Sequence, residues 1–125
     1  MKELLLAGLG GMLGSMLRYS LGVAAARHFN QPFPIGTFFI NGLGCLIIGI
    51  IMALSEKTGL VPREYRILVG VGFCGGFTTF SAFAWENLKL IQNGSWAVAA
   101  TYILLSVIGG LLLTWGGYQF SKNIF

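Results

Sequence analysis

Charged residues are scarce in this sequence, and so are the side chains that enzymes use for catalysis. Only 10% of its residues are charged, whereas soluble domains carry roughly a quarter. It has four acidic residues, one histidine and two cysteines, and it shows no catalytic triad, phosphate-binding loop or dinucleotide fingerprint. The eight basic residues do not form the clustered basic face that nucleic-acid binding requires. We therefore expect neither an enzyme nor a nucleic-acid-binding protein.

The few potential metal ligands are dispersed. Cys45 and Cys74 both fall within apolar stretches, where cysteine commonly behaves as a small buried hydrophobe. No Cys-x-x-Cys or His-rich pairing accompanies them, and His28 stands beside Arg27 in a connecting segment. We expect the cysteines to be structural and His28 to lie at a solvated interface.

Apolar residues dominate instead. Hydrophobic types make up 55% of the 125 residues, and the mean hydropathy is +0.77. The sequence therefore predicts an all-α, multi-pass integral membrane protein, a single four-helix domain over residues 1–125, with both termini on the same side of the lipid bilayer. Four apolar stretches approach the roughly twenty residues that cross a bilayer, namely Leu4 to Ala26, Ile35 to Leu54, Ile67 to Ile91 and Ser95 to Phe120.

Two charged residues lie in or near these stretches. Arg18 follows Gly10 and Gly14 at steps of four residues, on a face suited to close helix packing. A charge inside a span indicates function by default, but we favour a structural anchor that bonds loop carbonyls, because an arginine in a narrow pore would trap a small anion. Arg18 also interrupts the apolar core of what would otherwise resemble a secretory signal, so we expect a retained helix. Glu86 could pair with Lys89 or Arg18, or serve at a vestibule, and we favour pairing.

The third apolar stretch contains the residues of an interrupted helix. Gly75 and Gly76 weaken helical continuity. The hydroxyls of Thr78, Thr79 and Ser81 can bond nearby backbone groups in place of the helix's own partners. Broken backbone at membrane depth is tolerated only where protein buries it or where it lines a wet cavity. The stretch therefore predicts a broken third helix and an ion site.

Three phenylalanines recur at every third position around this break. Phe77, Phe80 and Phe83 are predicted to share one face of the helix that resumes there. From spacing alone, that face is expected to pack against lipid or another helix.

Polar side chains also occur inside the second and fourth stretches. The amide of Asn41 offers two N–H donors, which suit an anion, but it could equally bond across a helix interface. In the fourth stretch, Tyr102, Ser106, Gly110 and Thr114 follow a four-residue step. Hydroxyls in this pattern could join helices or line a polar track through a pore. Sequence spacing leaves both alternatives open.

Together these residues resemble the Fluc fluoride channels, also called CrcB proteins. The resemblance covers essentially the whole chain, and its most specific motif is the one from Gly72 to Phe83. One departure is Ala82, where family members often carry threonine. The matching pieces, in family order, are Gly11-x-x-Gly14 with Arg18-Tyr19, Pro34-x-Gly36-Thr37 with Asn41, and Gly72-Phe73-Cys74-Gly75-Gly76-Phe77-Thr78-Thr79-Phe80-Ser81-Ala82-Phe83.

The resemblance implies an antiparallel, dual-topology homodimer with two fluoride pores and a central structural sodium ion (Na+). It implies that backbone carbonyls of Gly75 and Thr78 from both subunits hold the sodium. Its pore residues would be the aromatic rings of Phe80 and Phe83 and the amide of Asn41. From their chemistry, the hydroxyls of Thr79, Ser81, Tyr102 and Ser106 could supply further hydrogen bonds to the anion, and we expect Arg18 and Glu86 in structural or vestibule positions.

The resemblance thus implies a fluoride-selective channel in the inner (plasma) membrane, for passive export of cytoplasmic fluoride. Two alternatives stay open. A small proton-coupled multidrug exporter would need a membrane-embedded carboxylate, for which Glu86 is the only candidate. A non-transporting membrane assembly subunit would use the glycine faces for packing alone. The basic residues favour cytoplasmic termini, an asymmetry that works against two opposite orientations in the membrane.

Overall fold

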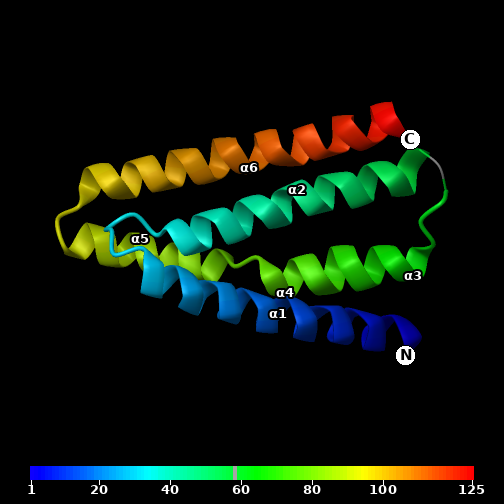
Figure 1. The fold of residues 1–125 in the computed structure, drawn as a ribbon, viewed down its shortest axis with the longest axis horizontal. Helices are drawn as coiled ribbons and strands as arrows, with labels where there is room; N and C mark the ends of the chain where they lie inside the picture. Colours follow the sequence, from blue (N-terminus) through cyan, green and yellow to red (C-terminus); the bar gives the residue numbers. More distant parts are fainter. Residues whose placement is uncertain (58) are drawn as a thin grey trace.

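Four helical spans run side by side in alternating directions (Figure 1). The computed structural model describes residues 1–57 and 59–125, without the side chain of Lys57. Its elements are α1 (Lys2–His28), α2 (Ile35–Lys57), a third span made of α3 (Arg63–Tyr65), η1 (Arg66–Cys74), α4 (Gly75–Phe77) and α5 (Phe80–Gln92), and finally α6 (Trp96–Ile124).

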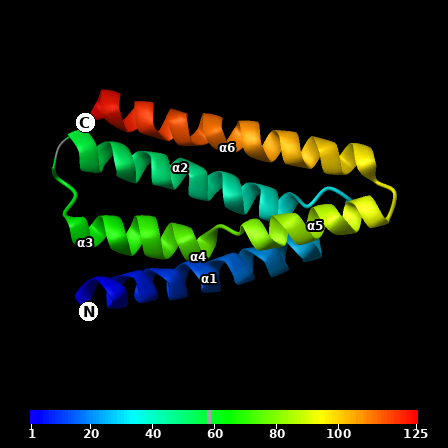
Figure 2. The ribbon, with the colours of Figure 1, turned by 180° about the vertical axis from the view of Figure 1, so that it is seen from behind.

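All four spans are long and apolar enough to cross a membrane, so the chain is a multi-pass membrane protein, as predicted. The helices extend beyond the predicted stretches by up to four residues, as at Arg63 and Ile124. Polar and basic residues continue a helix into the headgroup layer, which a hydropathy pattern does not register. Both termini lie at the same end of the bundle, and the view from behind shows the same arrangement (Figure 2).

The helices pack in two close pairs, α1 with η1 and α2 with α6. Glycines bring α1 and the third span into backbone contact: a Cβ on Gly14 would lie 2.8 Å from the Phe77 nitrogen, and one on Gly72 would lie 2.7 Å from the Ala7 oxygen. No side chain fits at such distances, which is the geometry of small-residue packing in membranes. The segment η1 is wound as a π-helix, a feature that the sequence pattern did not predict.

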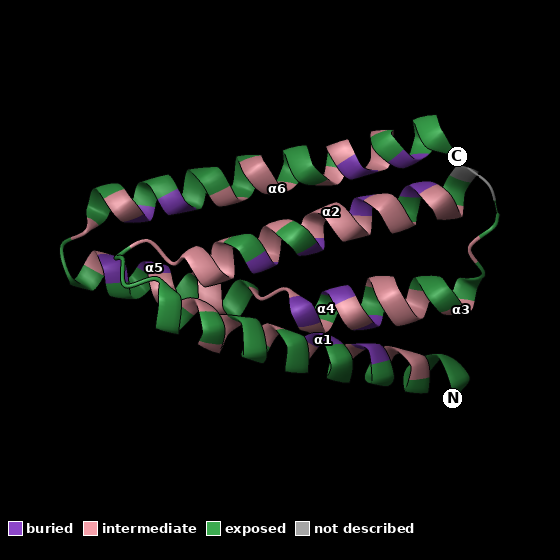
Figure 3. Cartoon of the chain, viewed as in Figure 1, coloured by how far each residue is buried: buried purple, intermediate pink, exposed green. Residues whose placement is uncertain are grey.

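Little of the chain is buried (Figure 3). Phe77 and Tyr102 are the two largest side chains that are fully enclosed, and Cys74 is also buried while Cys45 is half-buried. Large apolar side chains cover the outside, among them Leu111, which is 69% exposed. Such a surface belongs in lipid or against another protein.

The third span breaks at the two predicted threonines and not at the glycines before them. Gly75 and Gly76 are helical, and the chain turns extended at Thr78 (φ −82°, ψ 157°) and Thr79 (φ −150°, ψ 111°). Gly76 instead allows the backbone of α1 to approach closely, because a Cβ there would lie 2.9 Å from the Gly11 Cα. The glycines were therefore wrongly interpreted as the breakpoint; at Gly76 the small residue is required by packing.

Candidate functional site

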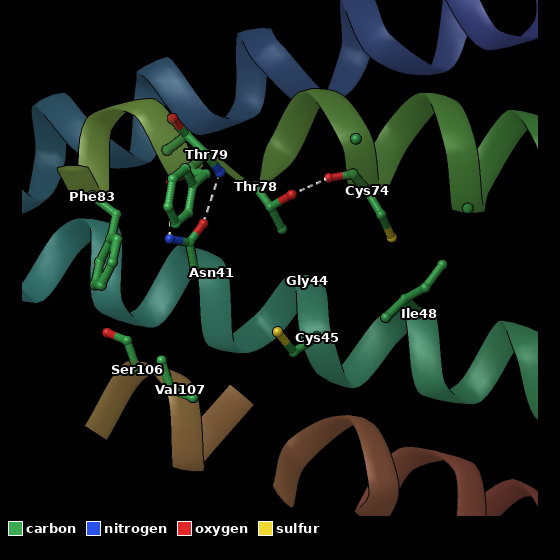
Figure 4. Close-up of a pocket in the computed structure, with 13 residues that line it drawn as sticks. Asn41, Gly44, Cys45, Ile48, Cys74, Thr78, Thr79, Phe83, Ser106 and Val107 are labelled. Atoms are coloured by element: carbon green, nitrogen blue, oxygen red, sulfur yellow. Dashed lines mark hydrogen bonds between the residues drawn. The ribbon is translucent and has the colours of Figure 1, made fainter. Parts of the chain in front are cut away.

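A pocket of about 460 Å³ opens at the break, between α2, the third span and α6 (Figure 4). It contains seven of the predicted site residues, and no charged side chain lines it. Ser81, Tyr102, Arg18 and Glu86 are not among its lining residues. The lining residues are Asn41, Gly44, Cys45, Ile48, Gly70, Cys74, Gly75, Thr78, Thr79, Phe80, Phe83, Ser106 and Val107.

Asn41 on α2 forms two hydrogen bonds with the backbone at the break. Its Nδ2 donates to the Thr79 carbonyl oxygen at 3.2 Å, and its Oδ1 accepts from the Thr79 N–H at 2.8 Å. The bond from the Thr79 N–H satisfies a backbone group that has no helical acceptor, as a half-buried group in a membrane requires. The other bond adds a donor to the carbonyl with which α5 begins. The interhelical contact is therefore present, while one further N–H of the amide is left for the pocket.

Side chains satisfy the start of α5 as well. Thr79 is the N-cap residue, and its Oγ1 accepts from the Ala82 N–H at 3.1 Å. The Ser81 hydroxyl, which is exposed, lies 3.3 Å from the same oxygen. The Thr78 hydroxyl turns the other way and donates to the Cys74 carbonyl at 2.7 Å.

Because of these side-chain bonds, two backbone carbonyls lack their usual helical donors. In an unbroken α-helix the carbonyl of Gly75 would accept from the Thr79 N–H, and that of Thr78 from the Ala82 N–H. Here both N–H groups donate to side-chain oxygens instead, on Asn41 and Thr79. Gly75 and Thr78 both line the pocket. Two carbonyl oxygens that have lost their helical partners therefore come from residues at the pocket wall.

Phe80 and Phe83 line the pocket as a pair. Their ring centroids are 5.7 Å apart, and Phe83 meets the Tyr102 ring edge-to-face at 4.9 Å. Phe80 is 79% exposed, unusual for so large an apolar side chain beside a polar break. Phe77, in contrast, does not share their face. It precedes the break, is fully buried and stacks on Phe73, so the predicted three-residue periodicity was wrong at Phe77 because no continuous helix joins it to Phe80.

Glu86 forms no ion pair with Arg18 or Lys89, contrary to the predicted pairing. Its carboxylate accepts from the Thr37 hydroxyl at 2.8 Å and from the Tyr102 hydroxyl at 2.9 Å. Lys89 lies over the Trp85 ring instead, 5.5 Å from its centroid. Hydroxyls on α2 and α6 thus hold the carboxylate.

Arg18 bonds the backbone of the third span just before the break. Its Nε donates to the Gly76 carbonyl at 3.0 Å, and the Ser15 hydroxyl lies 3.5 Å from the same oxygen. The guanidinium thereby satisfies a carbonyl whose helical partner would be the amide of Phe80, beyond the break. Arg18 is absent from the pocket lining.

The polar stripe of α6 faces α2. A Cβ on Gly110 would lie 3.3 Å from the Cys45 sulfur, and Thr114 backbone atoms lie against Gly49. Only Ser106 of the stripe lines the pocket. At the far end, the Tyr118 hydroxyl donates to Glu56 at 2.8 Å. The stripe thus combines helix packing with one pocket hydroxyl.

Sequence reasoning gave no role to Thr37 or Gly44. Thr37 holds Glu86, and Gly44 makes room for the Thr78 side chain, which a Cβ there would overlap. The only sequence signal was the position of Thr37 in a Pro-x-Gly-Thr motif at the start of α2. Neither contact follows from helical periodicity, since each joins residues more than thirty positions apart.

Comparison with known proteins identifies the family of this chain. The pattern of the family described as "CrcB-like protein, Camphor Resistance (CrcB)" matches residues 5–118. The chain belongs to this family. The match spans most of α1, the complete break and most of α6, so the family assignment includes every residue that lines the pocket.

Relatives align over nearly the full chain. A protein of Methylobacillus flagellatus named "Fluoride-specific ion channel FluC" is 41% identical, covering 98% of this chain and 96% of the relative. Proteins of the same name from Flavobacterium psychrophilum (40% identical, 99% of this chain and 100% of the relative) and Phocaeicola vulgatus (44%, 90% and 92%) are also similar.

Proposed function

We propose that this protein is a fluoride-selective channel that exports cytoplasmic fluoride passively, without a catalytic step. The observation that carries the proposal is the uncharged pocket at the helix break, lined by Phe80, Phe83 and Asn41, in a chain whose relatives are named fluoride-specific ion channels. Hydrogen fluoride enters cells as a neutral molecule and ionises in the less acidic cytoplasm. An inside-negative membrane potential then favours exit of the anion.

The pocket chemistry suits a small anion that must keep moving. Aromatic rings have a positive edge, so Phe80 and Phe83 can meet fluoride without a fixed charge that would hold it. The second N–H of Asn41 and the hydroxyls of Thr79 and Ser106 supply hydrogen bonds along the same wall. Ser81 and Tyr102 adjoin this wall through Thr79 and Phe83. In this proposal Glu86 and Arg18 position the pore walls.

We further propose that two copies assemble antiparallel, with dual topology and two pores. Gly75 is exposed with open space around it, and Phe80 beside the break is 79% exposed. Extended backbone at membrane depth does not face lipid. A second copy that covers this surface would shield the break and complete the pore wall, which supports the homodimer.

The family resemblance implies a structural sodium ion, and the residues present fit it. Gly75 and Thr78 have carbonyl oxygens without their helical partners, and carbonyl oxygens can replace the hydration shell of such a cation. One chain offers this pair of carbonyls, so a central ion needs the same pair from the second copy. The ion would neutralise the two facing sets of carbonyl dipoles and hold the break in place.

Fluoride efflux from liposomes tests the proposed channel. Purified protein is reconstituted, and release of fluoride and of chloride is followed with ion-selective electrodes. We expect fast fluoride efflux with negligible chloride release, unaffected by an imposed proton gradient. Efflux that requires the proton gradient would favour the exporter, and no flux of either anion from correctly inserted protein would favour the assembly subunit.

A further inference from the structure

A second pocket lies away from the break, between the C-terminal half of α1 and the start of α2, and has a volume of about 300 Å³. We propose that it binds an acyl chain of an anionic phospholipid, whose headgroup phosphate contacts His28 and Arg27. This binding site is separate from the proposed fluoride pore and does not depend on it.

The pocket wall is apolar. Small residues, Ala24 and Ala25 on α1 and Gly36 on α2, leave the space, and the fully buried Phe77 also lines it. Phe39, which is 66% exposed, lies on the outer side. His28 is the only titratable residue in its lining, and no carboxylate is present. Such a cavity in a membrane suits a hydrocarbon chain and would not retain water or a polar ligand.

Basic groups lie at one end of the pocket. His28 lines it, and Arg27 is the preceding, exposed residue in the last turn of α1. The His28 Nδ1 lies 2.8 Å from the Ala24 carbonyl. A carbonyl only accepts, so Nδ1 is the donor in this contact. The permanent positive charge next to this ring is the guanidinium of Arg27, which attracts a phosphate.

The depth of these groups in the membrane matches that of a headgroup. The exposed Trp85 and Trp96 (60% and 64%) belong to α5 and to the start of α6. These segments lie at the same end of the bundle as the end of α1 (Figure 1). Exposed tryptophans mark the membrane–water interface. A lipid whose phosphate lies at this level directs its chains toward the bilayer centre, along the α1–α2 pocket.

A pocket of the same size between α2 and α6 provides an internal comparison. It is also about 300 Å³ and includes Gly42, Gly109 and Leu113, but no basic residue lines it. Apolar shape alone is thus common to both pockets. The basic pair is specific to the α1–α2 pocket and selects an anionic lipid there.

Thermal unfolding in detergent, with dioleoyl phosphatidylglycerol or dioleoyl phosphatidylcholine added, tests the proposal. We expect the anionic lipid to raise the Tm of the wild-type protein more than the zwitterionic lipid does. Arg27→Gln/His28→Gln should remove the difference between the two lipids. Ala24→Trp, which fills the pocket from an exposed position, should remove most of the response to phosphatidylglycerol, and Ala24→Leu provides a milder version should the larger side chain disturb folding.

Matched controls are available in the same chain. Arg66→Gln removes a basic residue at the opposite end, and Gly109→Leu narrows the α2–α6 pocket at a position with open space. Both should keep the wild-type preference. Equal Tm shifts with the two lipids in the wild-type protein, or a preference retained in Arg27→Gln/His28→Gln, would overturn the proposal. A change of oligomeric state in Ala24→Leu would also overturn it, because the pocket would then be a contact between copies.

Discussion

Asn41 bonds Thr79 through both ends of its side-chain amide, as donor to the carbonyl and as acceptor from the N–H. One side chain on α2 thereby supplies the acceptor that the Thr79 N–H lacks at the break and adds a second bond to the Thr79 carbonyl, with which α5 begins. Asn41 therefore has two roles: it bonds the backbone at the break and it lines the pocket. Variants at Asn41 can separate these roles.

Replacing Asn41 should affect stability and flux differently. Asn41→Ala leaves the half-buried Thr79 N–H without a partner, at about 1–3 kcal/mol, and should lower both Tm and fluoride efflux. Asn41→Asp keeps the acceptor but adds negative charge to the pocket, so efflux should fall more than Tm. Asn93→Asp, in the exposed turn before α6, is the control. Unimpaired conduction in Asn41→Asp would mean that Asn41 only joins helices.

The two pocket phenylalanines should be essential to conduction and less important to folding. Phe80→Ile and Phe83→Ile keep apolar bulk but remove the ring edges, so we expect efflux to fall at least about tenfold, equivalent to about 1.4 kcal/mol on the barrier. The dimer should persist in size-exclusion chromatography. Phe120→Ile changes an exposed phenylalanine away from the pocket and should conduct normally. Normal flux in both pocket variants would remove the aromatic-pore hypothesis.

Backbone contact between α1 and the third span should make Gly14 intolerant of any side chain. A Cβ at Gly14 would lie 2.8 Å from the Phe77 nitrogen, and overpacking of this kind destabilises by about 1–3 kcal/mol. We expect Gly14→Ala to lower the Tm in detergent. Gly8→Ala, on the same helix with open space around it, should be neutral or stabilising by up to about 1 kcal/mol through helix propensity. Equal Tm values for the two variants would contradict this packing.

Sodium removal should destabilise the assembled protein. A ligand bound only by the folded state contributes about 2.7 kcal/mol at a hundredfold excess over its Kd. Dialysis into N-methylglucamine should therefore lower Tm and efflux, and sodium should restore both at concentrations where potassium does not. The proposed ligands are backbone carbonyls. A shorter side chain at Thr78 should therefore lower Tm and efflux less than removal of sodium does. Sodium-independent stability and flux would exclude the site at Gly75 and Thr78.

The sequence predicted the features that depend on local pattern. Hydropathy located the four spans, and the four-residue step placed Gly10, Gly14 and Arg18 on a face that packs against the third span. The hydroxyls of Thr78 and Thr79 marked the break, because they compete with backbone partners.

Other features depend on contacts between distant segments. The sequence predicted the break at Gly75 and Gly76. The helix continues through them, because α1 packs on Gly76 and because the Thr79 N–H, three residues later, donates to Asn41. Glu86 likewise takes hydroxyl partners from two other spans. Periodicity within one segment carries no information on such partners, and the roles of the pocket residues in conduction and sodium binding stay predictions.

The hydrogen bonds at the break also bear on how the chain assembles during translation. A third span inserted alone would present extended, unpaired backbone at Thr78 and Thr79 to hydrocarbon, which the bilayer does not tolerate. Its partners Arg18 and Asn41 belong to α1 and α2, which leave the ribosome earlier. The order of synthesis therefore delivers the groups that satisfy the break before the break itself reaches the membrane.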